Sequence, residues 1–121
     1  MGVSVTIIDS LMGFLWKSES EQIAEQIREQ AKFILQQFNG IDEVFSRDGG
    51  ATPYNMEELS LYMQRIERYH EAIQVNLNKL SASQQGRLVL PWVNGRYYDL
   101  QAWNFSYMMV INKIIQELNK V

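Results

Sequence analysis

The chain has 121 residues, a net charge of −3 and no cysteine, and its lysines and arginines are scattered singly. One domain covering residues 1–121 is expected at this length, and the absence of a basic run argues against DNA as a partner. The lack of cysteine and the single histidine exclude disulfides, thiol chemistry and multi-histidine metal sites, so no cofactor and no metal are expected.

The N-terminal region predicts neither a leader peptide nor a membrane span. No basic region precedes its apolar run, and the longest uncharged stretch, residues 100–112, is too short and too polar to cross a bilayer. We therefore expect a cytoplasmic protein. Within residues 3–17 an apolar helical stripe predicts a short amphipathic helix, formed by Ile7, Ile8, Leu11, Met12, Leu15 and Trp16.

The second predicted helix covers residues 18–40. Ser18 followed by Glu21 is a capping-box pattern, and Gly40 predicts the C-terminal stop, with at most one further turn around residues 41–45. One apolar stripe runs along this helix, made of Ile23, Ile27, Ala31, Ile34 and Phe38.

The third predicted helix covers residues 56–80 and follows a break at Asp48-Gly49-Gly50. Asn55 is the expected N-cap, with Glu58 three residues later as in a capping box. A heptad pattern without a slip predicts the core-facing seam, which consists of Leu59, Met63, Ile66, His70, Ile73, Leu77 and Leu80.

A β-hairpin is predicted near residues 87–99. Asn94-Gly95 favours a two-residue turn with positive φ at both positions, which would pair Trp92 with Tyr97 and Pro91 with Tyr98. Asp99 is expected to cap a final helix of about twenty residues. That helix is apolar over most of its circumference, so it is either the central helix of the bundle or a helix that also faces a partner.

The spacing Arg65-x4-His70 resembles the signature of HEPN-type ribonucleases, which are small all-helical domains that dimerise. The resemblance implies that Arg65 positions an RNA phosphate and that His70 takes part in cleavage. The heptad seam favours a different role, because five helical positions rotate the two side chains to different faces and place His70 inward among aliphatic residues. We expect a neutral, buried, hydrogen-bonded histidine with Tyr62, Tyr69 or a water molecule as partner.

Aromatic residues concentrate between positions 92 and 107. They predict a surface that stacks a flat ligand or anchors a protein, or else a cover for one end of the bundle. The candidate binding residues are Trp92, Asn94, Arg96, Tyr97, Tyr98 and Trp103.

The sequence therefore predicts a mainly α-helical bundle of three long helices and a short N-terminal one, with a hairpin before the last helix. The leading functional hypothesis is a non-enzymatic protein–protein interaction module, such as an adaptor, inhibitor, immunity or chaperone-like subunit, with a protein partner or self-association. The alternatives are a HEPN-like ribonuclease using Arg65 and His70, or a small-ligand sensor using the aromatic cluster at 92–107.

Overall fold

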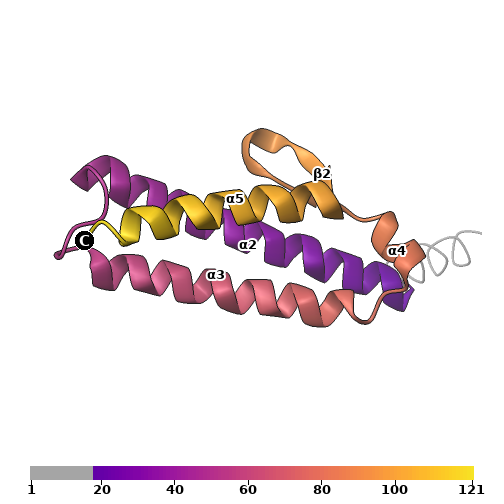
Figure 1. Ribbon diagram of the computed structural model, residues 1–121. Helices are drawn as coiled ribbons and strands as arrows, with labels where there is room; N and C mark the ends of the chain where they lie inside the picture. The colour runs from indigo at the N-terminus through magenta and orange to yellow at the C-terminus, as the bar shows by residue number, and fades with distance from the viewer. Residues whose placement is uncertain (1–17) are drawn as a thin grey trace, which may run out of the picture.

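The computed structural model describes residues 18–121, and three long helices form most of it (Figure 1). These helices are α2 (Glu19–Asp48), α3 (Met56–Leu77) and α5 (Leu100–Leu118). Between α3 and α5 the chain forms a short helix and two antiparallel strands: α4 (Ala82–Gly86), β1 (Val89–Pro91) and β2 (Tyr97–Asp99). The mainly helical bundle with a hairpin before its last helix is confirmed, and the helix predicted within residues 3–17 lies outside the described residues.

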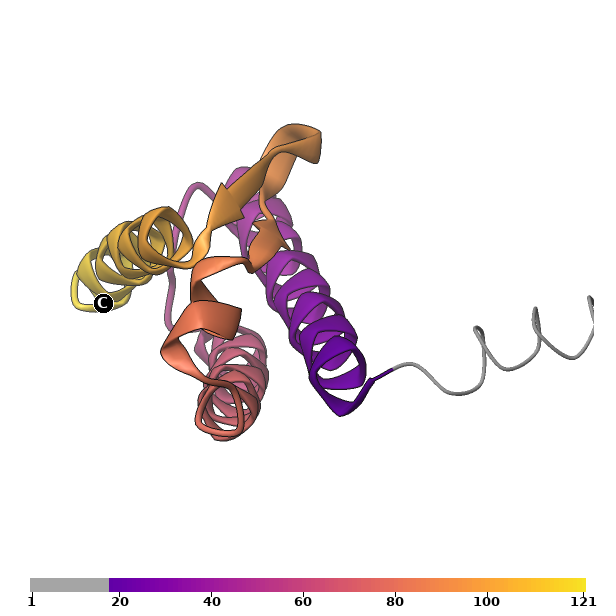
Figure 2. The same ribbon diagram turned by 90° about the vertical axis from the view of Figure 1, so that its right-hand side faces the viewer.

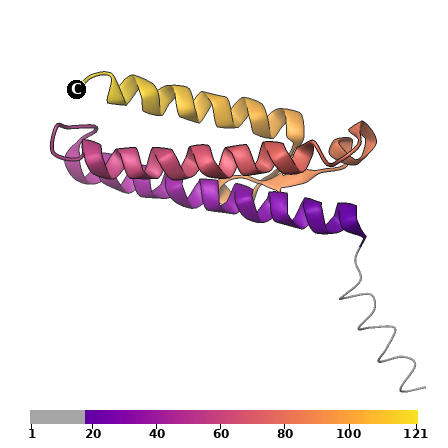
Figure 3. The same ribbon diagram turned by 90° about the horizontal axis from the view of Figure 1, so that it is seen from below.

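The three long helices occupy the corners of a triangle in the end-on view, with the hairpin on the side of α2 and α5 (Figure 2). Helices α2 and α3 lie alongside each other over most of their length, and α5 lies across from this pair (Figure 3). The predicted stripes of α2 and α3 supply much of the core, in which Ile27, Ile34, Leu59, Ile66 and Ile73 are almost completely buried. The helical periodicity of the sequence therefore places the core correctly on these two helices.

The predicted stop at Gly40 is wrong, because α2 continues to Asp48 and ends where Gly49 adopts a left-handed φ of 74°. The apolar stripe also continues beyond Gly40, with Ile41 and Val44 buried. Gly40 serves close packing instead. A Cβ at this position would lie 2.6 Å from Cζ of Tyr62 on α3, well inside van der Waals contact. The missing side chain therefore makes room for the Tyr62 ring between the two helices.

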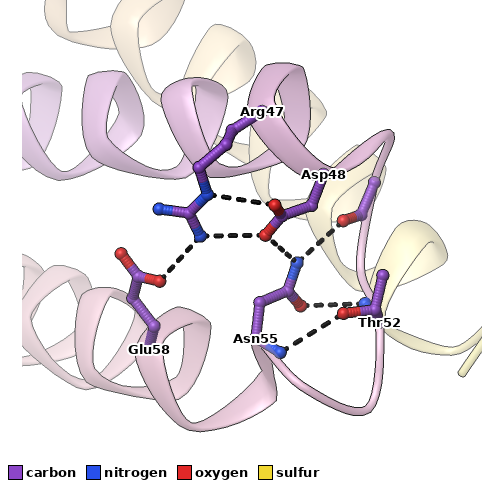
Figure 4. Close-up of polar contacts among 6 residues, drawn as sticks. Arg47, Asp48, Thr52, Asn55 and Glu58 are labelled. Atoms are coloured by element: carbon purple, nitrogen blue, oxygen red, sulfur yellow. Dashed lines mark hydrogen bonds and ion pairs between the residues drawn. The ribbon is translucent and has the colours of Figure 1, made fainter.

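Asn55 holds the turn between α2 and α3. Its side chain was expected to cap α3, but it makes no hydrogen bond to that helix. Its Oδ1 accepts the backbone N–H of Thr52 at 2.8 Å, and its Nδ2 donates to Asp48 at 3.0 Å and to the Gly50 carbonyl at 2.9 Å (Figure 4). With its oxygen and both amide hydrogens engaged inside the turn, the Asn55 side chain makes no hydrogen bond to the first turn of α3.

Arg47 links the same turn to α3. Its guanidinium donates to Asp48 at 2.8 Å and to Glu58 at 3.0 Å, so Glu58 takes part in an ion pair (Figure 4). The hydrogen bonds from Arg47 and Asn55 lower the pKa of Asp48 to about 2. This carboxylate thus stays ionised in the folded protein over the whole neutral and mildly acidic range.

The hairpin register is shifted by one residue from the prediction. The observed pairs are Pro91 with Tyr97 and Leu90 with Tyr98, and Asn94 and Gly95 both have positive φ within a three-residue loop. The Trp92 N–H donates to the Arg96 carbonyl at 2.8 Å. In an antiparallel pair of strands, hydrogen-bonded and non-hydrogen-bonded residue pairs alternate. Because Trp92 is in a hydrogen-bonded pair, Pro91 is in a non-hydrogen-bonded one, where its lack of an N–H costs nothing. The predicted two-residue turn would have put Pro91 where a donor is required.

Helix α3 ends at Leu77, three residues before the predicted end, and residues 78–80 form a turn. Gln85 of α4 donates from Nε2 to the Leu77 carbonyl at 2.8 Å, which satisfies one of the free carbonyls at the helix end. Helix α4 was not predicted, and its Ser81 and Gln84 form a complete capping box. None of the helices in residues 18–121 has the length and apolar content needed to cross a membrane.

Candidate functional site

The inner face of α5 is held by an aromatic stack against the hairpin and α2. Asp99 caps the helix as predicted, accepting the Ala102 N–H at 2.8 Å. The fully buried Trp103 donates from Nε1 to the Pro91 carbonyl at 2.9 Å and stacks on Tyr107, with ring centroids 5.3 Å apart. This contact fixes both the rotation of α5 and the position of β1.

The outer face of α5 is apolar and exposed to solvent. Phe105 is 67% exposed, Met108 51%, Met109 47% and Ile115 42%, and we call these four side chains the α5 patch. They lie on one side of the helix, opposite Trp103, Tyr107 and Ile114, and the exposed Asn112 lies on the same side between the two methionines and Ile115. No Asp, Glu, Lys or Arg occurs from Leu100 to Asn112. Helix α5 is therefore not enclosed by the other described helices, and the expectation that its outer face meets a partner stays a prediction.

Open grooves flank α5 on both sides. The groove against α3 has a volume of about 530 Å³ and is lined on the α5 side by Tyr107, Ile111 and Leu118. The groove against α2 has a volume of about 380 Å³ and includes Phe45 and Val110. Helix α5 is thus anchored near its N-terminus by the aromatic stack, while its C-terminal half leaves apolar surface accessible.

His70 lies in the groove between α3 and α5 and is half-buried against the Tyr107 ring, so the prediction of a histidine buried among aliphatic residues is wrong. Its ring stacks on Tyr107 at 4.4 Å with an interplanar angle of 4°, and its Nε2 lies 3.4 Å from Nε2 of Gln74. Neither predicted partner tyrosine hydrogen-bonds to it, since Tyr69 packs on Phe33 and Tyr62 packs at Gly40.

Burial lowers the pKa of His70 below its usual 6.5, although the nearby Glu71 carboxylate opposes this shift. Burial also raises the pKa of the Tyr107 phenol to about 12, with the negative charge of Glu67 acting in the same direction. Both rings are therefore neutral at pH 7, and the stack carries no charge of its own.

The structure does not bring Arg65 and His70 together within one chain. The Arg65 guanidinium lies over the Tyr62 ring at 5.8 Å, on the edge of α3 that faces α2. His70 stacks on α5 at the opposite edge of the same helix. The pair therefore faces two different neighbours, and a role for it in RNA cleavage stays a prediction.

The aromatic cluster divides into buried and exposed members. Trp92 and Trp103 are both buried, with ring centroids 5.8 Å apart at 84°, so they belong to the core beneath the hairpin. Tyr98 stacks on Trp92 at 6.1 Å and is half-buried. Only Tyr97 among these four is mostly exposed. The two tryptophans thus explain how the hairpin is seated on the helices.

The loop candidates lie on the outside of the hairpin. Asn94 is exposed with a φ of 61°, which fits the known tolerance of asparagine for left-handed backbone. Arg96 is exposed and donates to the Tyr98 hydroxyl at 3.5 Å, which raises its pKa above the usual value. Neither of the two grooves beside α5 is lined by Asn94, Arg96 or Tyr97. A ligand role for the cluster stays a prediction.

The α5 patch is a candidate surface that was missing from the predicted site residues. Its signal was present in the unbroken apolar circumference of residues 100–112, but the sequence alone does not say which side of such a helix faces the core. The neutral Trp103–Pro91 hydrogen bond decides this rotation, and it depends on the hairpin register.

Residues 18–121 contain no group of three or more His, Cys, Asp or Glu side chains placed to hold a metal ion. Comparison of the chain with known protein families, with curated protein sequences and with solved structures finds no match. The arrangement of α5 and its flanking grooves is therefore the basis for a functional proposal.

Proposed function

We propose that this protein is a non-enzymatic interaction module and that its docking surface is the α5 patch together with the adjoining groove toward α3. One observation carries the proposal: four large apolar side chains on one helix face are between 42% and 67% exposed. Taking about 200 Å² for a full side chain of this size, they expose roughly 400 Å² of apolar surface.

A patch of this size is at the level at which exposed apolar surface on a monomer is often functional. Burying it would contribute about 10 kcal/mol at 25 cal/mol per Å² before the costs of association, which are themselves about 4–15 kcal/mol. The α5 patch alone therefore supports at most a weak complex. The neighbouring groove adds further surface toward the about 800 Å² per partner that is typical of a stable interface.

The position of the patch also favours a docking role. The core-facing side of α5 is filled by Trp103 and Tyr107, so the patch is not needed to hold the helix in place. Phe105, Met108 and Met109 lie in the stretch from Leu100 to Asn112, which has no charged residue, so covering this part of the patch desolvates no charge of α5. Aromatic residues and methionine are also the side chains enriched in the centres of interfaces.

Site-specific photo-cross-linking in the native cell tests this proposal. A photoreactive amino acid is placed at Phe105 or Ile115 on the α5 patch, and, as matched controls, at Glu43 of α2 or Val75 of α3, which are also exposed. We expect a discrete cross-linked protein from the two α5 positions and none from the controls. Met109→Asp, an exposed position in the same patch, should abolish the adduct at Ile115.

The opposite pattern would contradict the proposal. If all four positions yield the same adducts, or if neither α5 position yields any, the α5 patch is not a docking surface.

A further inference from the structure

The groove between α3 and α5 has an apolar floor and is acidic on its α3 side. The floor consists of Met63, Ile66, Tyr107, Ile111 and Leu118. Glu67 and Glu71 line the α3 side one helical turn apart, and both are exposed. No lysine or arginine lines this groove. His70 also lines it and is neutral at pH 7, because burial lowers its pKa.

Glu67 and Glu71 are like charges at i and i+4, which repel each other and destabilise an isolated helix slightly. Neither has an ion-pair partner among the described residues. A positive charge placed between them from outside would relieve this repulsion. The α2–α5 groove differs in this respect, because Lys113 lies beside Asp42 and Glu117 there and the local charges are mixed.

The length of the groove suits a helix. Its α3 side runs from Ser60 to Glu71, which is about three helical turns or 16 Å. A helix laid in such a groove contacts it through residues at i, i+3 or i+4, and i+7 over the same length. The α5 patch continues the apolar floor outward, since Met108 and Ile115 lie on α5 next to Ile111.

We propose that the α3–α5 groove binds an amphipathic helix of a partner protein, whose apolar stripe lies on the groove floor and whose flanking lysine or arginine residues face Glu67 and Glu71. The proposal rests on the function proposed above and adds the chemistry of the partner. A second copy of this chain fits less well, because it brings the same two glutamates, and the one lysine within α5, Lys113, lines the groove toward α2. An anionic membrane surface would be repelled by Glu67 and Glu71.

Fluorescence anisotropy with two designed helical peptides tests the charge preference on the full chain. One peptide carries a leucine stripe flanked by lysines and the other the same stripe flanked by glutamates, each three to four turns long. We expect the lysine peptide to bind about tenfold more tightly or better, with an affinity that falls as salt is raised. Glu67→Gln/Glu71→Gln should remove about tenfold of this affinity.

Glu29→Gln/Glu43→Gln on the outer face of α2 changes the net charge equally and should leave binding unchanged. Equal binding of both peptides, or no effect of Glu67→Gln/Glu71→Gln, would overturn the proposal. So would a chain that sediments as a dimer and binds neither peptide, since a second copy would then occupy the groove. If cross-links from Phe105 and Ile115 persist in any of these cases, the interaction function stands and only the proposed partner chemistry fails.

Discussion

Gly40→Ala should destabilise the protein when the Tyr62 ring lies opposite it on α3, and stabilise it when that ring is removed. In the middle of a helix, alanine normally stabilises by about 1 kcal/mol relative to glycine. Here the added Cβ would lie 2.6 Å from Cζ and 2.9 Å from Oη of Tyr62, so the ring must move. Overpacking of this kind costs about 2 kcal/mol, which leaves a net loss of about 1 kcal/mol in the free energy of unfolding.

The matched background is Tyr62→Ala, in which the ring is gone and the new methyl group has room. In that background Gly40→Ala should stabilise by about 1 kcal/mol. The coupling between the two sites is then about 2 kcal/mol. Urea unfolding followed by circular dichroism at helical wavelengths measures all four proteins of this double-mutant cycle.

The reasoning fails if Gly40→Ala stabilises the protein by the same amount with and without the Tyr62 ring. That result would mean that α2 and α3 are not held at the observed separation by Gly40. A destabilisation that is equal in both backgrounds would likewise place the clash somewhere other than at Tyr62.

Three further predictions concern single side chains. Asn55→Ala removes three hydrogen bonds of a buried amide and should lower the free energy of unfolding by roughly 2–4 kcal/mol in urea titrations; a loss below about 0.5 kcal/mol would show that the turn does not depend on them. Folding lowers the pKa of His70, so the unfolded chain is protonated before the folded one as pH falls, and the free energy of unfolding should decrease below pH 6.5. His70→Gln should remove this decrease between pH 7 and pH 5. An identical pH profile for the variant and the wild type would refute the prediction. Trp103→Phe leaves the Pro91 carbonyl without its indole donor and should cost roughly 2 kcal/mol in thermal unfolding, whereas an unchanged midpoint would show that this bond does not seat α5.

The helices of this bundle were predictable because their apolar residues recur with helical spacing. The buried positions Ile23, Ile27 and Ile34 on α2, and Leu59 and Ile66 on α3, are those that the periodicity selects. The caps at Ser18 and Asp99 were also predictable, since each side chain accepts a backbone N–H three residues later. Signals that act within a few residues are thus reliable in this chain.

The errors arose where a residue that favours a local motif makes other contacts in the folded protein. Gly40 looks like a helix stop, but the ring of Tyr62 on another helix explains the glycine. Asn55 looks like an N-cap, but Asp48, Gly50 and Thr52 compete for its side chain. At Gly40 a contact between two helices outweighs the local propensity, and at Asn55 hydrogen bonds within the turn outweigh it.

The hairpin register and the rotation of α5 depend on each other in the same way. Asn94-Gly95 favours a two-residue turn, while Pro91 tolerates only the register in which it donates no hydrogen bond. With that register Trp92 is buried and the Pro91 carbonyl meets Trp103, so the opposite face of α5 points to solvent. The α5 patch could not be identified before this chain of contacts was known.

The affinity of the cross-linked partner for the wild-type protein and for Phe105→Ser/Met109→Ser tests the central claim most directly. Both side chains are largely exposed, so the double variant should unfold at the same urea concentration as the wild type. If the α5 patch is the docking surface, their loss should cost about 3 kcal/mol of binding free energy, or roughly a hundredfold in Kd by isothermal titration calorimetry. An unchanged Kd with the fold intact would contradict the claim.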